Sequence, residues 1–212
     1  TRMSLEQRPE PGQQRFHHAA IGVDALAQTE AAIARHQRRR LFEVEIVLVE
    51  AMLAAELGLP YAVALFINPQ FDPRIVEAYR SRFRPSPLQP EPRVMIAMNV
   101  FCADDEAHAA TMTRAADITY IRFLTQRGEI AVCSPEEAAQ HVFSPEERAF
   151  VQGVSRVRAV GTPQTIRERV ERFATQFHAD EVMAVCNTFH FADRLRSFEL
   201  LAQAFGVGRA SA

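Results

Sequence analysis

The sequence predicts an α/β fold built on a parallel sheet. Short apolar runs of strand length alternate along the chain with longer segments in which apolar residues recur at helical spacing. Most of the helical segments begin at a capping residue or end at a glycine. When strands and helices alternate in this order, the strands pair in parallel and the helices pack outside the sheet. The chain of 212 residues is long enough to form one domain.

Four strands are expected, at residues 42–48, 61–67, 94–102 and 181–187, paired in sequential order. The first range alternates apolar and charged residues, which is typical of a strand with one exposed face. The second and third ranges are continuous apolar runs, which are typical of strands buried on both faces.

Helices are expected between and after these strands. The first ends at Gly58, because Pro60 follows and glycine is the commonest residue just past a helix end. The others begin at capping or proline signals, and the serine signals are two copies of Ser-Pro-Glu-Glu, read as paired short helices in an insertion. The start signals are Asp72-Pro73, Asp104-Asp105, Ser134-Pro135, Ser144-Pro145 and Gly161-Thr162-Pro163.

Composition excludes several classes of protein. The net charge of −2 creates no field that would attract the chain to nucleic acid or a membrane surface. No apolar run approaches the length of a membrane span. Cys102, Cys133 and Cys186 lack metal-binding spacing, and there is no His-Glu-x-x-His motif, so neither a disulfide framework nor a metal site is expected. Reduced thiols indicate a cytoplasmic protein.

Four stretches carry a resemblance to a known family: Leu53–Ala62, Pro92–Val100, Gly161–Ile166 and Ala179–Val185. In them the chain resembles the bacterial luciferase-like flavin-dependent monooxygenases. The resemblance implies a partial (β/α)8 TIM-like barrel made of the four C-terminal βα units, with parallel strands. A complete barrel typically needs about 250 residues, so part of a barrel is the better fit.

The resemblance divides the chain into three parts. Residues 42–206 form the luciferase-like partial barrel domain. Residues 1–41 are a poorly matched leader, expected to be partly disordered, with a weak helical pattern from Asp24 to about Arg40. Residues 207–212 are expected to be a flexible tail. The chain starts at Thr1 and not at a methionine, so a fragment of a longer protein is expected.

Candidate site residues follow from the rule that barrel enzymes work at the carboxyl ends of their strands. Asn99 and Asn187 are candidates for flavin binding, and His190 is a candidate for catalytic proton transfer. Gly161 and Thr162 offer free amides at a helix start, which suits an anion. Except for Asn187, each has a plainer alternative: Asn99 could cap strand backbone, His190 could be an exposed loop residue, and Gly161 with Thr162 could be a simple helix cap.

The resemblance implies that reduced FMN, supplied by a separate flavin reductase, and O2 oxygenate a small organic substrate. Relatives hold the flavin phosphate at a Gly-Ser-Ser turn, where this chain has Glu45-Ile46-Val47. A carboxylate and two β-branched side chains oppose phosphate binding, so weak FMN binding and an incomplete or impaired enzyme are expected.

Two other functions remain open. One is a non-catalytic half-barrel that binds flavin or acts as an assembly subunit. The other is an unrelated α/β domain that binds nucleic acid through Arg35–Arg40, against which a solvated helix end is the plainer interpretation. The strands at 42–47 and 182–187 would leave open sheet edges, so a homodimer or aggregates are expected in place of a monomer.

Overall fold

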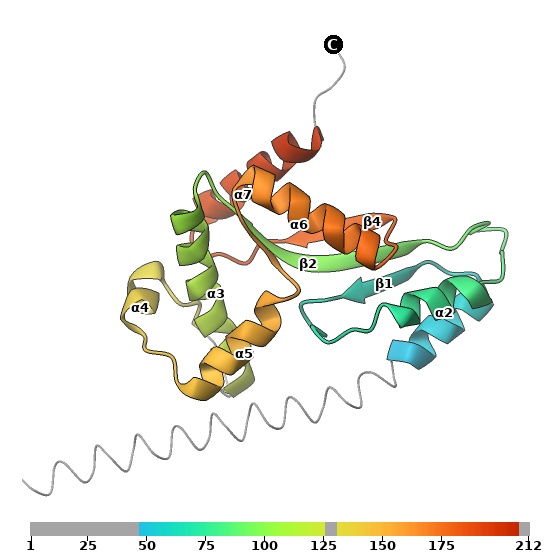
Figure 1. Ribbon diagram of the computed structural model, residues 1–212, viewed down its shortest axis with the longest axis horizontal. Coiled ribbons are helices and arrows are strands. Elements are labelled where there is room, and N and C mark those ends of the chain that lie inside the picture. The colour runs from blue at the N-terminus through green and yellow to red at the C-terminus, as the bar shows by residue number, and fades with distance from the viewer. Residues whose placement is uncertain (1–46, 126–130, 208–212) are drawn as a thin grey trace, which may run out of the picture.

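The computed structural model describes residues 47–125 and 131–207 (Figure 1). A helix over residues 47–57 comes first and carries no label. Ten labelled elements follow in this order: β1 (Tyr61–Ala64), α2 (Arg74–Arg82), β2 (Val94–Cys102), α3 (Glu106–Thr125), α4 (Pro135–Gln140), α5 (Pro145–Ser155), β3 (Ala159–Gly161), α6 (Pro163–Gln176), β4 (Glu181–Val185) and α7 (Phe191–Phe205).

The four strands form one parallel sheet with β2 at its centre. β1 pairs with the start of β2, from Tyr61 opposite Val94. β4 pairs with β2 from Glu181 opposite Met95 to Val185 opposite Asn99. β3 pairs only with the last three residues of β2. The described strands do not close into a ring, which confirms the predicted partial barrel.

Two predictions about the strands are wrong. Residues 42–46 of the first predicted strand lie outside the described residues, but Val47 and Leu48 belong to a helix. The fourth strand among the described residues is β3, which lies within the segment expected only to open a helix. The order is also not sequential, because β4 pairs with β2 and not with β3. β3 has only three residues and pairs only with the end of β2, whereas β4 pairs with residues 95–99 of β2.

The predicted helix ends at Gly58, Ser134 and Ser144 agree with the structure. Gly58 has a φ of +63°, and a Cβ there would lie 2.5 Å from the carbonyl oxygen of Arg84, so only glycine fits. Ser144 forms a complete capping box with Glu147, and Ser134 accepts the backbone N–H of Glu137. The strand β1 ends at Ala64, earlier than predicted. The carbonyl of Ala64 accepts the N–H groups of Ile67 and Asn68, which turns the chain away from the sheet.

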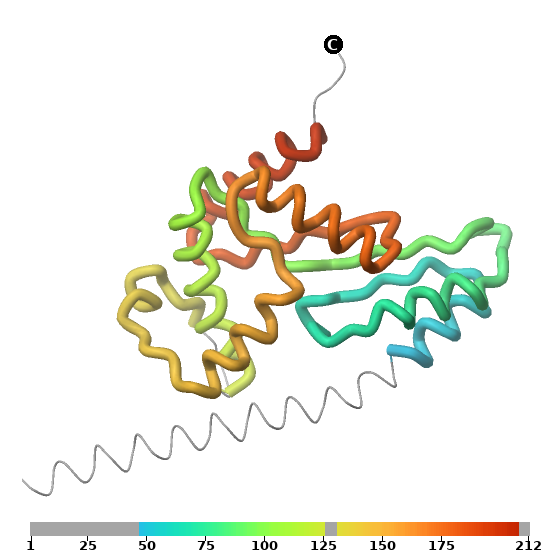
Figure 2. The backbone as a smooth tube through the Cα atoms, in the orientation of Figure 1, coloured from blue at the N-terminus to red at the C-terminus, as the bar shows by residue number. Residues whose placement is uncertain are grey.

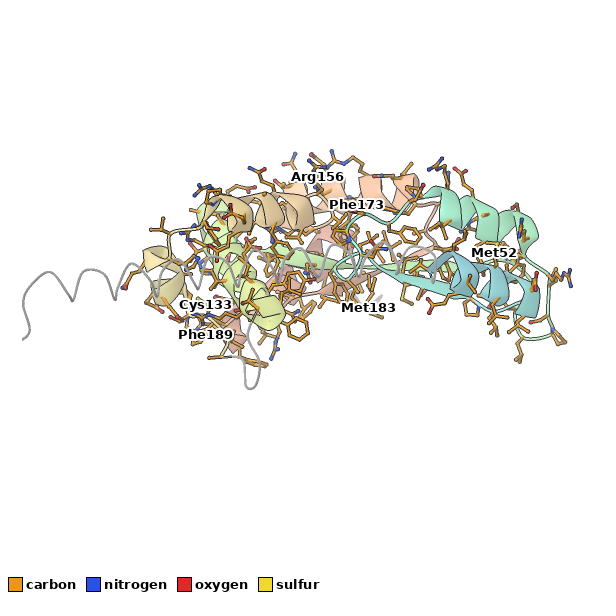
Figure 3. All side chains as sticks on the ribbon, turned by 90° about the horizontal axis from the view of Figure 1, so that it is seen from below. Met52, Cys133, Arg156, Phe173, Met183 and Phe189 are labelled. Atoms are coloured by element: carbon orange, nitrogen blue, oxygen red, sulfur yellow. The ribbon has the colours of Figure 1, made fainter. Side chains whose placement is uncertain are left out.

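The two sides of the sheet differ in how they are covered. Val63, Ile96 and Met98 point to the main core, where they pack with apolar side chains of α2, α6, α7 and the helix of residues 47–57. The helix of residues 47–57 and α2 lie side by side, as the tube in Figure 2 shows. The alternate residues of the strands define the open side, where Ala62 is exposed and Met183 is 50% exposed. Figure 3 shows Phe173 and Met183 on opposite faces.

Within the two described ranges, none of the helices has both the length and the apolar character needed to cross a membrane.

Candidate functional site

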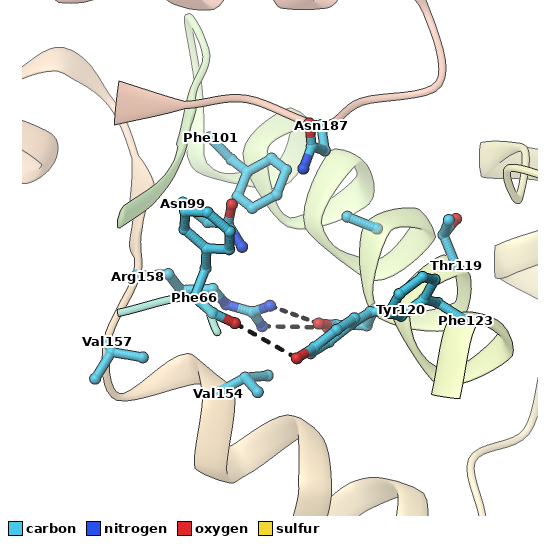
Figure 4. Close-up of a pocket in the computed structure, with 12 residues that line it drawn as sticks. Phe66, Asn99, Phe101, Thr119, Tyr120, Phe123, Val154, Val157, Arg158 and Asn187 are labelled. Carbon is cyan, nitrogen blue, oxygen red and sulfur yellow. Dashed lines mark hydrogen bonds and ion pairs between the residues drawn. The ribbon is translucent and has the colours of Figure 1, made fainter. Parts of the chain in front are cut away.

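A cleft of about 400 Å³ lies at the carboxyl end of the sheet (Figure 4). Its walls come from the ends of β1, β2 and β4, from α3, and from the segment that joins α5 to β3. Most of the lining is apolar and aromatic, with Phe66, Phe101, Tyr120 and Phe123 contributing rings. Ligand pockets in proteins combine such a lining with a few polar groups.

Besides the hydroxyls of Thr119 and Tyr120, the cleft is lined by two amide and two charged side chains: Asn99, Asn187, Asp117 and Arg158. Asn99 lies on β2, and Asn187 follows β4, its neighbour in the sheet. Because parallel strands end at the same edge, both asparagines line this cleft, as expected from their places at the strand ends. Asn187 is exposed, whereas the Oδ1 atom of Asn99 is fully buried.

Asp117 and Arg158 form a buried ion pair in the wall of the cleft. Their side chains are 7% and 10% exposed. Arg158 Nη1 and Nη2 donate to the two carboxylate oxygens of Asp117 at 2.5 and 3.1 Å, and Nη2 also donates to Ser155 Oγ at 2.8 Å. Burial raises the pKa of Asp117, and the hydrogen bonds and charge of Arg158 oppose that rise. The fork geometry therefore fixes the guanidinium in one orientation.

Two buried polar atoms of residues that line the cleft have no hydrogen-bond partner among the described residues. They are Oδ1 of Asn99, which accepts, and Nε of Arg158, which donates. Both belong to residues that line the same cavity. A buried polar group without a partner costs about 1–3 kcal/mol, so such groups in a folded chain need an explanation. A ligand that offers one donor and one acceptor would satisfy both.

Gly161 and Thr162 lie away from this cleft, at the start of α6, where the chain supplies its own anion. The N–H of Thr162 donates to Glu106 Oε1 at 3.2 Å, and Thr165 Oγ1 donates to the same atom at 2.9 Å. Gly161 has a φ of +136°, and a Cβ there would lie 2.7 Å from both carboxylate oxygens of Glu106. The helix start that could hold an external anion thus binds a carboxylate of α3.

His190 does not line the cleft. It is exposed, it is the N-cap residue of α7, and its ring contacts that of Phe189 at a centroid distance of 4.9 Å. Of the Glu45-Ile46-Val47 turn, only Val47 is described, and its carbonyl accepts a hydrogen bond from the Tyr61 hydroxyl at 3.3 Å.

Sequence reasoning missed Asp117 and Arg158. They lie 41 positions apart and meet only because α3 packs beside the segment leading into β3. One sequence signal could have pointed to Asp117. It directly precedes Ile118, which was expected on the core-facing side of this helix, and a carboxylate there is unusual. In the described part of the chain, no group of three or more His, Cys, Asp or Glu side chains is placed to hold a metal ion.

Comparison with known proteins identifies relatives, although no protein-family model matches. The chain is 35% identical over 155 residues to the uncharacterized protein YwcH of Bacillus subtilis, which is 73% of this chain and 46% of that protein. It is 30% identical over 154 residues to a luciferase-like monooxygenase of Escherichia coli K12, covering 72% of this chain and 45% of that protein.

Solved structures give the same result. The crystal structure of apo-MsnO8 superposes with a TM-score of 0.62 at 29% identity, over 76% of this chain and 48% of that one. Monooxygenase RslO1 of Streptomyces bottropensis shares the fold, with a TM-score of 0.51 at 18% identity. The chain spans about half the length of the curated relatives it matches. With an unclosed parallel sheet and a cleft at its carboxyl end, the chain belongs to the luciferase-like monooxygenase family.

Proposed function

We propose that the cleft between Asn99 and Arg158 binds the ring system of FMN and that the chain takes part in flavin-dependent monooxygenation of a small organic substrate. The observation that carries this proposal is the pair of unpartnered buried atoms, one acceptor and one donor, in a cavity with aromatic walls. Reduced FMN, when bound, supplies the electrons for the activation of O2. A separate flavin reductase would provide it.

The residues present fit a flavin ring. Such a ring carries N–H and carbonyl groups along one edge, so Asn99 Oδ1 would accept from the former and Arg158 Nε would donate to the latter. Phe66, Phe101 and Tyr120 provide apolar surface for the faces of a planar ligand. The volume of about 400 Å³ falls within the range of small-molecule sites.

The chain's own residues act here by binding, orienting and excluding water. Asp117 holds Arg158 through two hydrogen bonds, so it is a positioning residue. The aromatic side chains keep the inner part of the cleft apolar, which strengthens hydrogen bonds made there. The proposal assigns no proton transfer to His190, because His190 lies outside the cleft.

Titration of flavin fluorescence tests the proposal. Asn99→Leu and Arg158→Lys each remove one proposed contact, and each should weaken binding about 10-fold, which corresponds to ~1.4 kcal/mol. Arg156→Lys is the matched control, because Arg156 is exposed and does not line the cleft. Equal affinities of the two variants and the unaltered chain would reject the site.

The phosphate is expected to add little, because Glu45-Ile46-Val47 stands where relatives have Gly-Ser-Ser. FMN and riboflavin should therefore bind with similar affinity, within about a factor of three (~0.65 kcal/mol). An FMN affinity that exceeds riboflavin affinity by orders of magnitude would show that a phosphate site exists elsewhere on the chain.

A second candidate is a non-catalytic subunit that holds flavin or assists assembly. It is favoured by the match to only about half of each relative. The rate of oxygen consumption, measured with FMN, a flavin reductase and its nicotinamide donor, distinguishes the monooxygenase from the non-catalytic subunit. Stoichiometric flavin retention without oxygen uptake above that of the reductase alone identifies the non-catalytic subunit.

A further inference from the structure

We infer that the outer edge of β1 and the outer edge of β4 are joining surfaces, and that a second copy of this chain occupies them to close a ring of strands. The first observation is that both strands pair on one side only among the described residues, each with β2. Open edges present N–H and C=O groups that pair with another strand.

The backbone of β1 shows which groups point outward. Tyr61 and Leu65 donate their N–H groups to β2, to the carbonyls of Arg93 and Ala97, at 2.9 and 2.8 Å. Backbone groups alternate in direction along a strand, so the N–H groups of Ala62 and Ala64 point away from β2. They face the side on which no described strand lies.

A groove of about 210 Å³ runs along this edge, between β1 and the helix of residues 47–57. At its end lies Asn68, which is only 5% exposed. The Nδ2 atom of Asn68 is buried and has no hydrogen-bond partner among the described residues, and Asn68 lines the groove. A strand in the groove would bring a carbonyl within reach of this donor, as in recognition by strand addition.

The open side of the sheet supports the same conclusion. Parallel sheets are normally covered on both faces, yet here Ala62 is exposed and Met183 is 50% exposed. Among the described residues, this face and the two outer strand edges are therefore available to the second copy.

A second copy is the occupant that matches both edges at once. The described strands all run in one direction. A two-fold axis along the strands therefore creates two identical joints, and in each joint β4 of one copy lies beside β1 of the other. This chain matches 46% of the length of YwcH, so two copies supply nearly the amount of sheet and helix of one whole relative. The open sides of the two sheets then face each other across the ring.

Light scattering after size-exclusion chromatography, over a wide range of concentration, tests the inference on the full chain. The unaltered chain should have the mass of a dimer. Met183→Arg and Ala62→Pro should each give a monomer. The first puts a charge on the open side, and the second removes a donor that points away from β2 and therefore spares the ladder between β1 and β2. Leu88→Arg is the matched control, because Leu88 is 88% exposed and outside the strands, and its dimer should persist.

Circular dichroism and thermal unfolding confirm that each variant is folded before its mass is interpreted. A monomer at every concentration, aggregates without a defined mass, or a dimer that survives both Met183→Arg and Ala62→Pro would overturn the inference. So would a monomer that purifies in a defined one-to-one complex with a different chain, because that outcome assigns the edges to another partner.

Discussion

The start of α6 and the cleft at the end of the sheet are both surrounded by groups that can bind a ligand, but only one of them is satisfied by the chain itself. At α6, the carboxylate of Glu106 accepts from Thr162 and Thr165 and fills the space beside Gly161. In the cleft, Asn99 Oδ1 and Arg158 Nε have no partner among the described residues. The contrast separates a polar cluster that stabilises the fold from one that is available to a ligand.

The largest effect on stability is expected at the buried ion pair of Asp117 and Arg158 in the wall of the cleft. Asp117→Ala leaves the Arg158 guanidinium buried and without its carboxylate, which should lower the free energy of unfolding by about 3–5 kcal/mol. Urea denaturation measures the loss. The double variant Asp117→Leu with Arg158→Met should lose much less, because it leaves no unpaired charge.

An exposed ion pair provides the control for Asp117. Arg167 and Glu171 are 57% and 55% exposed, so Glu171→Ala should cost only about 0.3–0.5 kcal/mol. If Asp117→Ala proves as mild as Glu171→Ala, the pair in the cleft wall does not fix Arg158 as we describe.

An intermediate effect is expected at the start of α6. Gly161→Ala forces a side chain into a backbone conformation with a φ of +136° and against the Glu106 carboxylate, which should cost about 1–3 kcal/mol. In a Glu106→Ala background the collision is relieved, so the cost of Gly161→Ala should fall without vanishing. Neither change should alter flavin affinity, and a parallel loss of flavin binding would contradict the separation of the two sites.

The smallest effect is expected at Asn99, with the opposite sign. Because Oδ1 has no partner to lose, Asn99→Leu should leave the free energy of unfolding unchanged or raise it by up to about 1 kcal/mol. Ser197→Ala is the contrasting variant. The Ser197 hydroxyl is fully buried and accepts the N–H of Cys102 at 3.0 Å, so its removal should cost about 1–3 kcal/mol. Equal losses for the two variants would show that Asn99 is already satisfied.

Much of the fold follows from local sequence, and the failures have local causes too. The strand at 94–102 and the serine caps were predicted because apolar runs and capping signals are read over a few residues. β3 was missed because three residues carry no periodic pattern. Val47 and Leu48 were assigned to a strand because an apolar run does not distinguish the end of a strand from the start of a buried helix.

In the cleft, too, some residues could be predicted from the sequence and others could not. Asn99 and Asn187 were predicted because the carboxyl ends of parallel strands meet at one edge, whatever lies between them in sequence. Arg158 could not be predicted, because its place depends on the packing of α3 against the segment before β3. The parallel direction of the strands is visible in a sequence pattern, whereas their order and the contact between two specific side chains are not.

The pairing of β4 with β2 also has a consequence for how the chain reaches its fold. Val94, at the start of β2, donates its N–H to the Asp180 carboxylate, 86 positions further on. During synthesis β1 and β2 leave the ribosome long before β4, so one edge of the central strand waits for a partner while most of the chain is made. Contacts over such separations form slowly because loop closure must come first. A chaperone that shields β2 until β4 emerges should therefore raise the yield of folded chain. It should leave the free energy of unfolding of the finished protein unchanged.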